Sequence, residues 1–355
     1  MNLSHPTWIE VDLAQFRKNI EAIRKHIGKS QFCLPVKANA YGHGLVEIAR
    51  AAPVDCFAVS CLQEGVALRK AGISLPILVL GAIHDTQIEE LLHFNLEFSI
   101  SSKFKADLLA HRKCRVHLEV DTGMQRTGVR PDTAISLMNH LKTLPCEVVG
   151  VYSHLATADQ PNDPFALKQI SAFKELVRQP PFQGIRAHLA NSGGVAHYPD
   201  SHLDMVRPGL MSFGYGSLPG IAPCFSLKSR VSYFKVVGSG TGIGYGHTYT
   251  TQKQTRIATI PIGYGDGYRR ALSNRGSVLI RGHRFPIVGT ICMDQFMVDI
   301  GDREAFVGDE VVLIGRQGND AITLAEMGKL CDTIPYEILC LFNERIPRIY
   351  SALPS

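Results

Sequence analysis

The chain has 355 residues, of which 45% are hydrophobic and 19% are charged, and its net charge is +5 at pH 7. This length is enough for one large domain and a smaller one, and the composition is ordinary for a globular protein. The basic residues are scattered along the chain without a long run. This distribution argues against binding to nucleic acid or to a membrane surface.

The first residues, MNLSHPTWIEVD, contain neither the basic nor the apolar segment of a secretory signal. No stretch approaches the ~18 apolar residues of a membrane-spanning helix. Nine cysteines occur, at positions 33, 56, 61, 114, 146, 224, 292, 331 and 340, and none forms a C-x-x-C pair. Several lie within apolar strand-like runs, which is typical of free, reduced thiols, so we expect a cytoplasmic protein.

The first two thirds of the chain alternate between apolar runs with β-branched residues and segments of helical period. The strand-like runs are CLPVKA (33–38), CFAVS (56–60), PILVLG (76–81), LEFSI (96–100), RVHLEVD (115–121), EVVGVYSHL (147–155), IRAHLAN (185–191) and DMVRPGLMSFG (204–214). Helical patterns begin at residues 45, 63, 86, 104, 133 and 164. Eight strands alternating with helices predict a (β/α)8 barrel over residues 1–225, with a doubly wound open sheet as the alternative.

After about residue 225 the pattern changes to short strands broken by Gly, Pro and Asn turns, as in TRIATIPI (255–262) and EVVLIG (310–315). Helical patterns are scarce there until LAEMGKLCD (324–332). We therefore predict a C-terminal all-β domain over residues 226–355, and the first ~10 residues are candidates to pack with it.

The fifth predicted strand has one polar and one apolar face, because strand residues alternate between faces. The polar face carries Arg115, His117, Glu119 and Asp121, and the apolar face carries Val116, Leu118 and Val120. In a barrel the polar set would point inward, where unpaired charge is costly. The interior of the barrel then either binds a ligand or contains a network of salt bridges.

In a (β/α)8 barrel, active-site groups lie at the C-terminal ends of the strands. The candidates at those ends are Lys37, Tyr41, residues 121–126, His154, Asn191, Ser192, Arg207, Pro208 and Gly209. A lysine in a protected pocket commonly anchors an aldehyde through a Schiff base, since burial lowers its pKa. Pyridoxal phosphate is such an aldehyde, and Tyr41, Ser192 and the backbone around Gly209 could hold its phosphate.

Metal and nucleotide motifs are not found. H-E-x-x-H is absent, and His188, His197 and His202 are spread along a loop, so we predict no metal site. The stretch GSGTGIGYG (238–246) lacks both nucleotide-binding spacings and has no helix after it. We interpret it as a chain bend that exposes Tyr245.

Taken together, these stretches resemble the alanine racemase family of fold-type III pyridoxal-phosphate enzymes. The similarity runs over nearly the whole chain and rests on WIEVDLAQFRKNI (8–20), VKANAYGHG (36–44), DTGMQRTG (121–128), SHLATAD (153–159), HLANSGG (188–194), VRPGLMSFGYG (206–216), GIGYGHTY (242–249), IPIGYGDGY (260–268), GTICMDQFMVD (289–299) and TIPYE (333–337). The lysine stretch and the cysteine-methionine-aspartate stretch are specific to this family.

The resemblance implies pyridoxal-phosphate-dependent interconversion of L-alanine and D-alanine, which would supply D-alanine for peptidoglycan. Lys37 would hold the cofactor and act as one of two bases, and the partner subunit's Tyr245 would be the other. Arg126 would lie between the cofactor and the substrate carboxylate, and His154 would lie against the cofactor ring. The active sites would thus be shared within a homodimer.

The resemblance also implies the residues that hold the cofactor and narrow the site. Tyr41, Ser192, Gly209, Leu210 and Tyr336 would bind the phosphate, Arg207 would meet the pyridine nitrogen, His188 would position Arg207, and Asn191 would lie beside the cofactor. Met293 and Asp294 would contact substrate from the partner's β domain, and Tyr264 would narrow the entrance. Because arginine is effectively never deprotonated, Arg207 would keep the pyridine nitrogen unprotonated and limit transamination.

One position departs from the family pattern. The family commonly has a lysine, modified to a carbamate, at the position of Glu119. Our hypothesis is that Glu119 pairs directly with Arg126 and needs no carbamate, which puts bicarbonate dependence in doubt.

Other functions stay open at this point. The nearest is a racemase for serine or another amino acid. A fold-type III decarboxylase would also use Lys37 and would need a catalytic cysteine. Cys292 matches that cysteine only loosely. The third alternative is a protein that binds the cofactor without catalysis. The members of this fold group with that function consist of a single barrel and lack the second domain.

Overall fold

A computed structural model describes residues 5–351 of the chain, which divide into two compact units. The barrel unit comprises residues 15–40 and 44–223. The β unit comprises, within the described range, residues 5–14, 41–43 and 224–351. Each unit is described by itself below.

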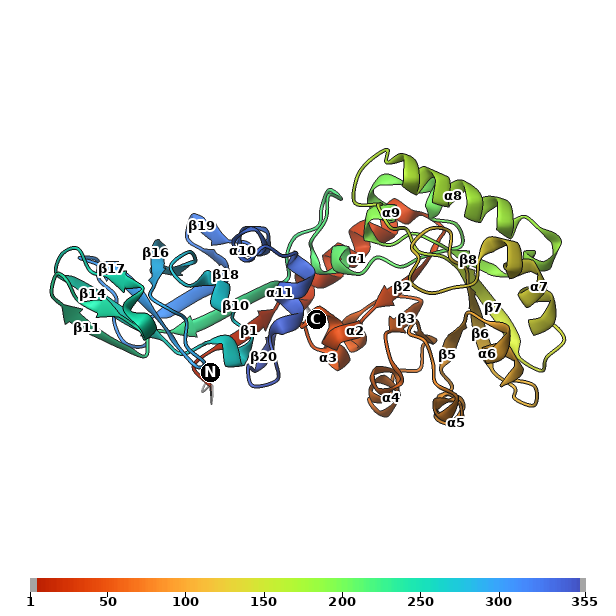
Figure 1. Ribbon diagram of the computed structural model, residues 1–355, viewed down its shortest axis with the longest axis horizontal. Coiled ribbons are helices and arrows are strands. Elements are labelled where there is room, and N and C mark those ends of the chain that lie inside the picture. The colour runs from red at the N-terminus through yellow and green to blue at the C-terminus, as the bar shows by residue number, and fades with distance from the viewer. Residues whose placement is uncertain (1–4, 352–355) are drawn as a thin grey trace. The chain divides into compact units, whose positions relative to one another are not determined.

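The barrel unit is built around eight parallel strands that form a closed barrel (Figure 1). In order around the barrel, the strands are β2 (Gln31–Pro35), β3 (Cys56–Val59), β4 (Ile77–Val79), β5 (Glu97–Ile100), β6 (Arg115–Glu119), β7 (Glu147–Tyr152), β8 (Arg186–His188) and β9 (Met205–Val206). The predicted (β/α)8 barrel is confirmed. The doubly wound alternative is wrong, because β9 pairs with β2 and closes the sheet.

Helices alternate with these strands. They are α1 (Leu13–Ile27), α2 (Lys37–Tyr41), α3 (Leu45–Ala51), α4 (Leu62–Lys70), α5 (Ile88–His93), α6 (Lys103–Asp107), α7 (Pro131–Leu141), α8 (Pro164–Val177) and α9 (Ser192–His197). In α8, Asp163 caps the N-terminus by accepting from the Ala166 N–H at 2.9 Å, and Pro164 occupies the first helical position. Ile170 and Phe173 lie on its buried face, and Figure 1 shows α7 and α8 on the outside of β7 and β8.

The observed barrel strands are all shorter than the predicted runs, and two of these differences concern candidate site residues. The run 33–38 ends as a strand at Pro35, and Lys37 opens the separate turn α2. The run 204–214 is a strand only at Met205–Val206, and a 3-10 turn, η4 (Leu210–Phe213), follows. Pro208 has no N–H to donate to a neighbouring strand, which explains the early end. Of the helices in the barrel unit, α1, α2 and α9 were not among the predicted helices.

The β unit contains a large, mostly antiparallel sheet with the strand order β11-β14-β17-β16-β15-β18-β10-β1-β20, and β19 pairs with β18. Its strands are β1 (Trp8–Val11), β10 (Phe225–Arg230), β11 (Tyr233–Val237), β14 (Thr255–Ile260), β15 (Ser277–Ile280), β16 (His283–Val288), β17 (Phe296–Gly301), β18 (Glu310–Gln317), β19 (Asp320–Ile322) and β20 (Arg348–Tyr350). A separate hairpin joins β12 (Gly242–Ile243) to β13 (Tyr249–Thr250), and two helices follow β19, namely α10 (Leu324–Cys331) and α11 (Pro335–Leu341).

Strand β1, near the beginning of the described residues, pairs in the sheet with β20, near their end. It pairs antiparallel with β10 and parallel with β20. The N-terminal strand is therefore an interior strand of the sheet in the β unit, directly between two strands that lie more than two hundred residues later in sequence.

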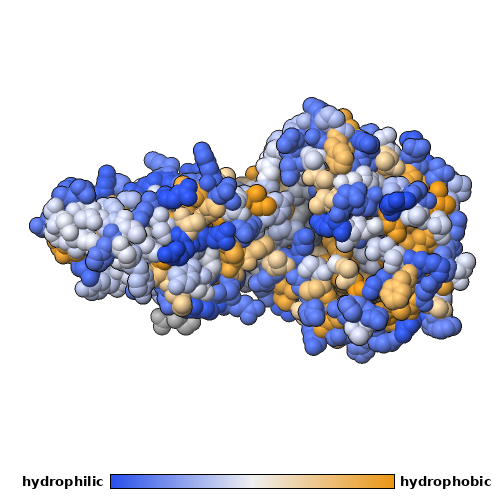
Figure 2. All heavy atoms as spheres, in the orientation of Figure 1, coloured by the Kyte–Doolittle hydropathy of each residue, from blue (hydrophilic) through white to orange (hydrophobic). Residues whose placement is uncertain are grey.

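The two faces of β6 are both buried. Val116 and Leu118 are fully buried, and so are His117 at 1% exposure and Glu119 at 6%. Within residues 5–351 no helix is long and apolar enough to cross a membrane, and no cluster of three or more metal-ligating side chains occurs. On the face drawn in Figure 2, hydrophilic residues predominate and apolar residues are interspersed among them.

Candidate active site

Lys37 opens a left-handed turn directly after β2. Ala38, Asn39 and Ala40 have φ values of 52°, 55° and 52° with ψ near 50°, and Tyr41 continues at φ 53°. Non-glycine residues disfavour this conformation by about 1–2 kcal/mol each. Four in succession mark a segment that the surrounding structure must hold in place, which is typical of functional sites.

Hydrogen bonds from outside the turn hold it. The Glu64 carboxylate on α4 accepts from the Ala38 N–H at 2.6 Å and from the Ser60 N–H at 2.8 Å. The Asn39 side chain accepts from the Leu45 N–H at 2.7 Å, at the start of α3. Sequence analysis missed Glu64 as a positioning residue, because an acidic residue in the first turn of a helix is common and nothing nearby in sequence marks it.

Four of the predicted barrel residues lie close together. The pKa of His154 is lowered to about 3, first by burial and then by the positive charges of Arg207, Arg126 and Lys37. The charges of these three cations thus all act on one imidazole at the same end of the barrel. His154 is therefore neutral at pH 7.

Arg207 is a buried cation with a defined set of partners. Its side chain is 3% exposed, and Nη1 donates to Nδ1 of His188 at 2.6 Å. Nη2 donates to the carbonyl oxygens of Ser153 at 2.7 Å and Leu189 at 3.3 Å. The guanidinium also lies 5.1 Å from the ring centre of Tyr152. Among the described residues no acceptor bonds to Nε or to the second hydrogen of Nη1, so two of the five N–H groups remain for further acceptors, Nε–H among them.

Asn191 and Ser192 organise the segment next to Arg207. Asn191 caps α9 by accepting from the Gly194 N–H at 3.0 Å, and its amide donates to the Leu155 carbonyl at 3.1 Å. The Ser192 hydroxyl accepts from the Met211 N–H at 3.3 Å, which joins the start of α9 to the turn η4 that follows Gly209. The first N–H groups of helical segments have no intrahelical acceptor, so this junction presents donors suited to an anion.

The hypothesis that Glu119 pairs directly with Arg126 is wrong for this structure. Among the described residues no ion pair joins them, and Oε1 of Glu119 accepts instead from the Thr127 hydroxyl at 2.6 Å. Burial raises the pKa of Glu119, while the Thr127 hydroxyl and the charges of Arg126 and Arg207 oppose this increase. Arg126 itself is exposed, so the charges of Glu119 and Arg126 interact without a direct ion pair.

In the β unit, Tyr41 and Tyr336 are neighbours. Their ring centres lie 6.1 Å apart at an angle of 55°, and Tyr41 is 6% exposed. The segment 41–43 lies against α11, since a side chain at Gly42 would collide with the Leu339 carbonyl. The Gly42 carbonyl also accepts from Nε of Arg348 at 3.2 Å. Two residues far apart in sequence are thus held as a pair.

Tyr245 is exposed, as the chain-bend interpretation of residues 238–246 predicts. Its side chain is 72% exposed at the turn after β12, and its carbonyl accepts from the Thr290 hydroxyl at 3.1 Å. It lines an open pocket of about 690 Å³ whose other residues include Tyr233, Cys292 and Met297. Tyr245 therefore lies beside the loop that carries Met293 and Asp294.

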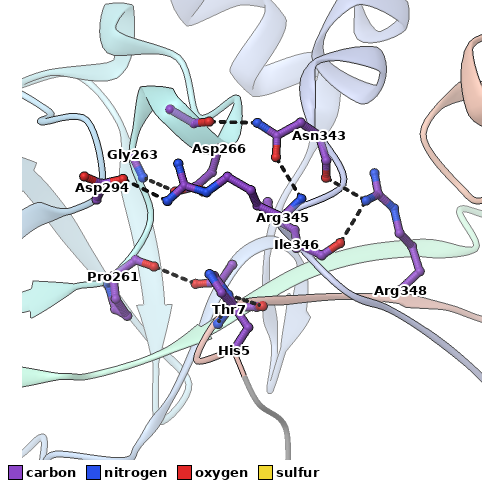
Figure 3. A network of polar contacts seen from close by, with 11 residues as sticks. His5, Thr7, Pro261, Gly263, Asp266, Asp294, Asn343, Arg345, Ile346 and Arg348 are labelled. Atoms are coloured by element: carbon purple, nitrogen blue, oxygen red, sulfur yellow. Dashed lines mark hydrogen bonds and ion pairs between the residues drawn. The ribbon is translucent and has the colours of Figure 1, made fainter.

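That loop is connected to the turn η6 (Tyr264–Asp266), and Figure 3 shows Arg345 beside Asp294 of the loop and Asp266 of the turn. The Tyr264 N–H donates to the Cys292 carbonyl at 3.1 Å, and the Gly265 N–H donates to the Met293 carbonyl at 2.8 Å. Arg345 lies between two carboxylates, 3.0 Å from Asp294 and 3.3 Å from Asp266. Tyr264 and Met293 are 44% and 54% exposed, so this edge of the β unit presents side chains outward.

Comparisons with known proteins agree with this geometry. Residues 11–217 match the family model "Alanine racemase, N-terminal domain", and residues 224–350 match "Alanine racemase, C-terminal domain". The chain belongs to the alanine racemase family. It is 44% identical to the alanine racemase of Symbiobacterium thermophilum, over 97% of each chain.

Solved alanine racemases have the same fold. The structure from Clostridium difficile 630 superposes with a TM-score of 0.93 at 35% identity, covering 99% of this chain and 97% of that one. The structure from Bacillus anthracis with bound L-Ala-P also has a TM-score of 0.93, at 34% identity over 99% and 96% of the two chains. The predicted family is confirmed.

The barrel residues fit the cofactor that this family uses. A pyridine nitrogen needs one donor, and Arg207 has an N–H at Nε that no described residue accepts. A phosphate needs several donors, and the junction of α9 with η4 offers backbone N–H groups and the Ser192 hydroxyl. A lysine is available at the start of the turn that opens at the same end of the barrel.

Proposed function

We propose that the chain is a pyridoxal-phosphate-dependent alanine racemase that interconverts L-alanine and D-alanine. The observation that carries the proposal is the group of Lys37, Arg126 and Arg207 around His154, in a barrel of the alanine racemase family. Lys37 begins a strained turn, and strained, pre-positioned lysines are suited to covalent chemistry.

When bound, pyridoxal phosphate supplies the electron sink that makes the Cα proton of an amino acid acidic. The chain's residues divide the remaining work. Lys37 holds the cofactor and then receives or returns a proton at its Nζ. Arg126 orients the substrate carboxylate, since a guanidinium binds a carboxylate in a fixed geometry. Ser192, Gly209 and Leu210 hold the phosphate through donors at the α9–η4 junction.

Racemisation requires two bases on opposite faces of Cα, one to remove the proton and one to return it. Tyr245 is the second base of the proposal, and its hydroxyl moves a proton on the face opposite to Lys37. Its 72% exposure in one chain supports a position in which a second chain covers it. Tyr245, Met293 and Asp294 lie together on one edge of the β unit, so one partner subunit could supply all three.

The proposal therefore includes a homodimer with shared active sites. It also includes a role in supplying D-alanine for peptidoglycan and a cytoplasmic location. All nine cysteines are free thiols in the described range, which suits a reducing compartment.

The test is chiral analysis of L-alanine incubated with the purified, pyridoxal-phosphate-loaded protein, beside a Lys37→Ala variant. We expect D-alanine from the wild type and none from the variant. A yellow, folded wild-type protein that forms no D-alanine would contradict the proposal for alanine, and serine would be the next substrate to measure.

The decarboxylase alternative finds less support. Such an enzyme would need a reactive cysteine, and burial raises the pKa of the Cys292 thiol. A raised pKa leaves less of the nucleophilic thiolate at neutral pH. Carbon dioxide release from alanine or basic amino acids would be the measurement that favours this alternative.

A further inference from the structure

A chain of hydrogen bonds runs from Arg207 into the barrel interior. Arg207 Nη1 lies 2.6 Å from Nδ1 of His188, and Nε2 of His188 lies 2.8 Å from Nδ1 of His117. Nε2 of His117 then lies 2.9 Å from Oε2 of Glu97, and Arg115 lies 2.9 Å from the other oxygen of Glu97. The hydrogen-bond chain thus runs from Arg207, directly after β9, through the last residue of β8 and through β6 to the first residue of β5.

The direction of every hydrogen bond in this chain follows from its two ends. A guanidinium only donates, so Nδ1 of His188 must be the bare acceptor nitrogen. Nε2 of His188 then carries its proton and donates to Nδ1 of His117. Nε2 of His117 carries its proton in turn and donates to the Glu97 carboxylate, which accepts. The two imidazoles are thus held in one tautomer each, and neither can reverse while Arg207 and Glu97 keep their charges.

Burial and charge agree with these protonation states. His117 and His188 are 1% and 0% exposed, and burial lowers the pKa of both imidazoles, so both are neutral near pH 7. Burial raises the pKa of Glu97, but the hydrogen bond from His117 and the charges of Arg115 and Arg186 outweigh it and leave that pKa lowered. Glu97 is therefore the anion at the end of the chain.

The barrel leaves room for this chain at one particular position. Gly150 on β7 lies under the His117 ring, and a methyl group there would collide with Nδ1 and its neighbouring ring carbon. The His188 ring is held from the other side, because Tyr152 stacks on it with ring centres 4.9 Å apart at 17°. The two imidazoles thus have little freedom to turn.

We propose that Glu97 and His117 are positioning residues for Arg207. They fix the tautomer and orientation of His188, and so hold the Arg207 guanidinium with its free N–H directed to the ring nitrogen of the cofactor. This inference rests on the proposed function for the role of Arg207, but the hydrogen-bond polarity does not depend on a cofactor.

The first part of the test is 15N NMR of the full-length protein labelled at histidine, with and without pyridoxal phosphate. We expect neutral rings with the proton on Nε2 for both His188 and His117, and a His117→Phe variant assigns the signals. A proton on Nδ1 of His188, or a doubly protonated ring, would overturn the inference.

The second part of the test uses variants that interrupt the chain of hydrogen bonds in different ways. His117→Phe keeps an aromatic ring but removes both nitrogens. Gly150→Ala displaces the His117 ring and changes no polar group. Cys56→Ala is the matched control, because Cys56 is a buried residue of β3 in the same barrel that makes no bond in the chain.

The readout is the 15N signal of the pyridine nitrogen in labelled cofactor, with the yield of pyruvate per racemisation turnover beside it. We expect both chain-breaking variants to shift the pyridine signal and to raise the pyruvate yield about tenfold, a change of ~1.4 kcal/mol in relative barrier heights. The Cys56→Ala control should change neither. If His117→Phe does not fold, Gly150→Ala makes the same measurement.

An unchanged pyridine signal in folded His117→Phe or Gly150→Ala protein would overturn the positioning role. The two proposals can fail separately. A protein that forms no D-alanine but carries the predicted His188 tautomer contradicts the proposed function and leaves the hydrogen-bond polarity established.

Discussion

At the scale of single residues, burial beside cations decides how Glu119 and His154 behave. Glu119 is 6% exposed and accepts a hydrogen bond from Thr127, so its charge is held at a fixed place near Arg126 without a direct pair. His154 is kept neutral by burial and by three neighbouring cations. One prediction below tests the negative charge of Glu119, and another tests the neutral state of His154.

The charge of Glu119 should make activity independent of dissolved carbon dioxide. We expect the wild-type racemisation rate to be unchanged when bicarbonate is removed, because a carboxylate already occupies this position. Glu119→Lys should lose about tenfold or more in rate, since it places a cation beside Arg126, and should recover partly in bicarbonate as a carbamate forms.

Glu119→Gln is the matched control for that experiment. It removes the charge, cannot form a carbamate, and should show no recovery in bicarbonate. Stimulation of the wild type by bicarbonate would contradict the role assigned to Glu119.

The lowered pKa of His154 should make the protein sensitive to acid. Between pH 6.5 and about 3 the unfolded state binds a proton at this histidine that the folded state does not, so the free energy of unfolding rises with pH. In that window we expect wild-type stability to fall, as the pH is lowered, by up to about 1.4 kcal/mol per pH unit more than that of His154→Gln. Urea unfolding of both proteins at several pH values measures this difference. The prediction is contradicted if the free energy of unfolding depends on pH equally in the two proteins.

At the scale of elements, the left-handed turn α2 shows how strain is placed where Lys37 needs a fixed position. Ala38 is exposed, so its φ of 52° is supported by hydrogen bonds at its backbone and not by packing of its side chain. Removing the strain should therefore stabilise the fold and loosen the site.

We expect Ala38→Gly to raise the free energy of unfolding by about 0.5–1 kcal/mol, because glycine removes ~1–2 kcal/mol of strain at a smaller entropic cost. The racemisation rate should fall, since the turn then holds Lys37 less firmly. The matched control is Ala67→Gly in the right-handed helix α4, where the same substitution should destabilise by about 1 kcal/mol. If both substitutions change the free energy of unfolding in the same direction, the turn is not strained.

At the scale of the whole molecule, the proposal divides each active site between two chains. Lys37 lies in the barrel unit and Tyr245 in the β unit. If each site combines Lys37 of one chain with Tyr245 of the other, two inactive variants can complement one another.

We expect Lys37→Ala and Tyr245→Phe homodimers to be nearly inactive alone. After mixing and exchange of subunits, half of the dimers should be mixed, each with one intact site, so activity should return to about a quarter of the wild-type value. Sites built within single chains would give no recovery, and size-exclusion chromatography of differently tagged chains would confirm that exchange has taken place.

The sequence by itself determined the βα alternation, the all-β second part and the family, because these depend on periodicity and on local motifs such as VKANAYGHG (36–44). It also placed Lys37, His154, Ser192 and Arg207 at one end of the barrel, since the C-terminal ends of parallel strands meet there.

Only the tertiary structure decided the left-handed turn after β2, its support by Glu64, and the hydrogen bond from Thr127 to the buried Glu119. It also decided that Arg207, His188, His117 and Glu97 form one polarised chain above Gly150. These features depend on contacts between residues far apart in sequence and on burial that fixes protonation, and neither leaves a periodic signal in the chain.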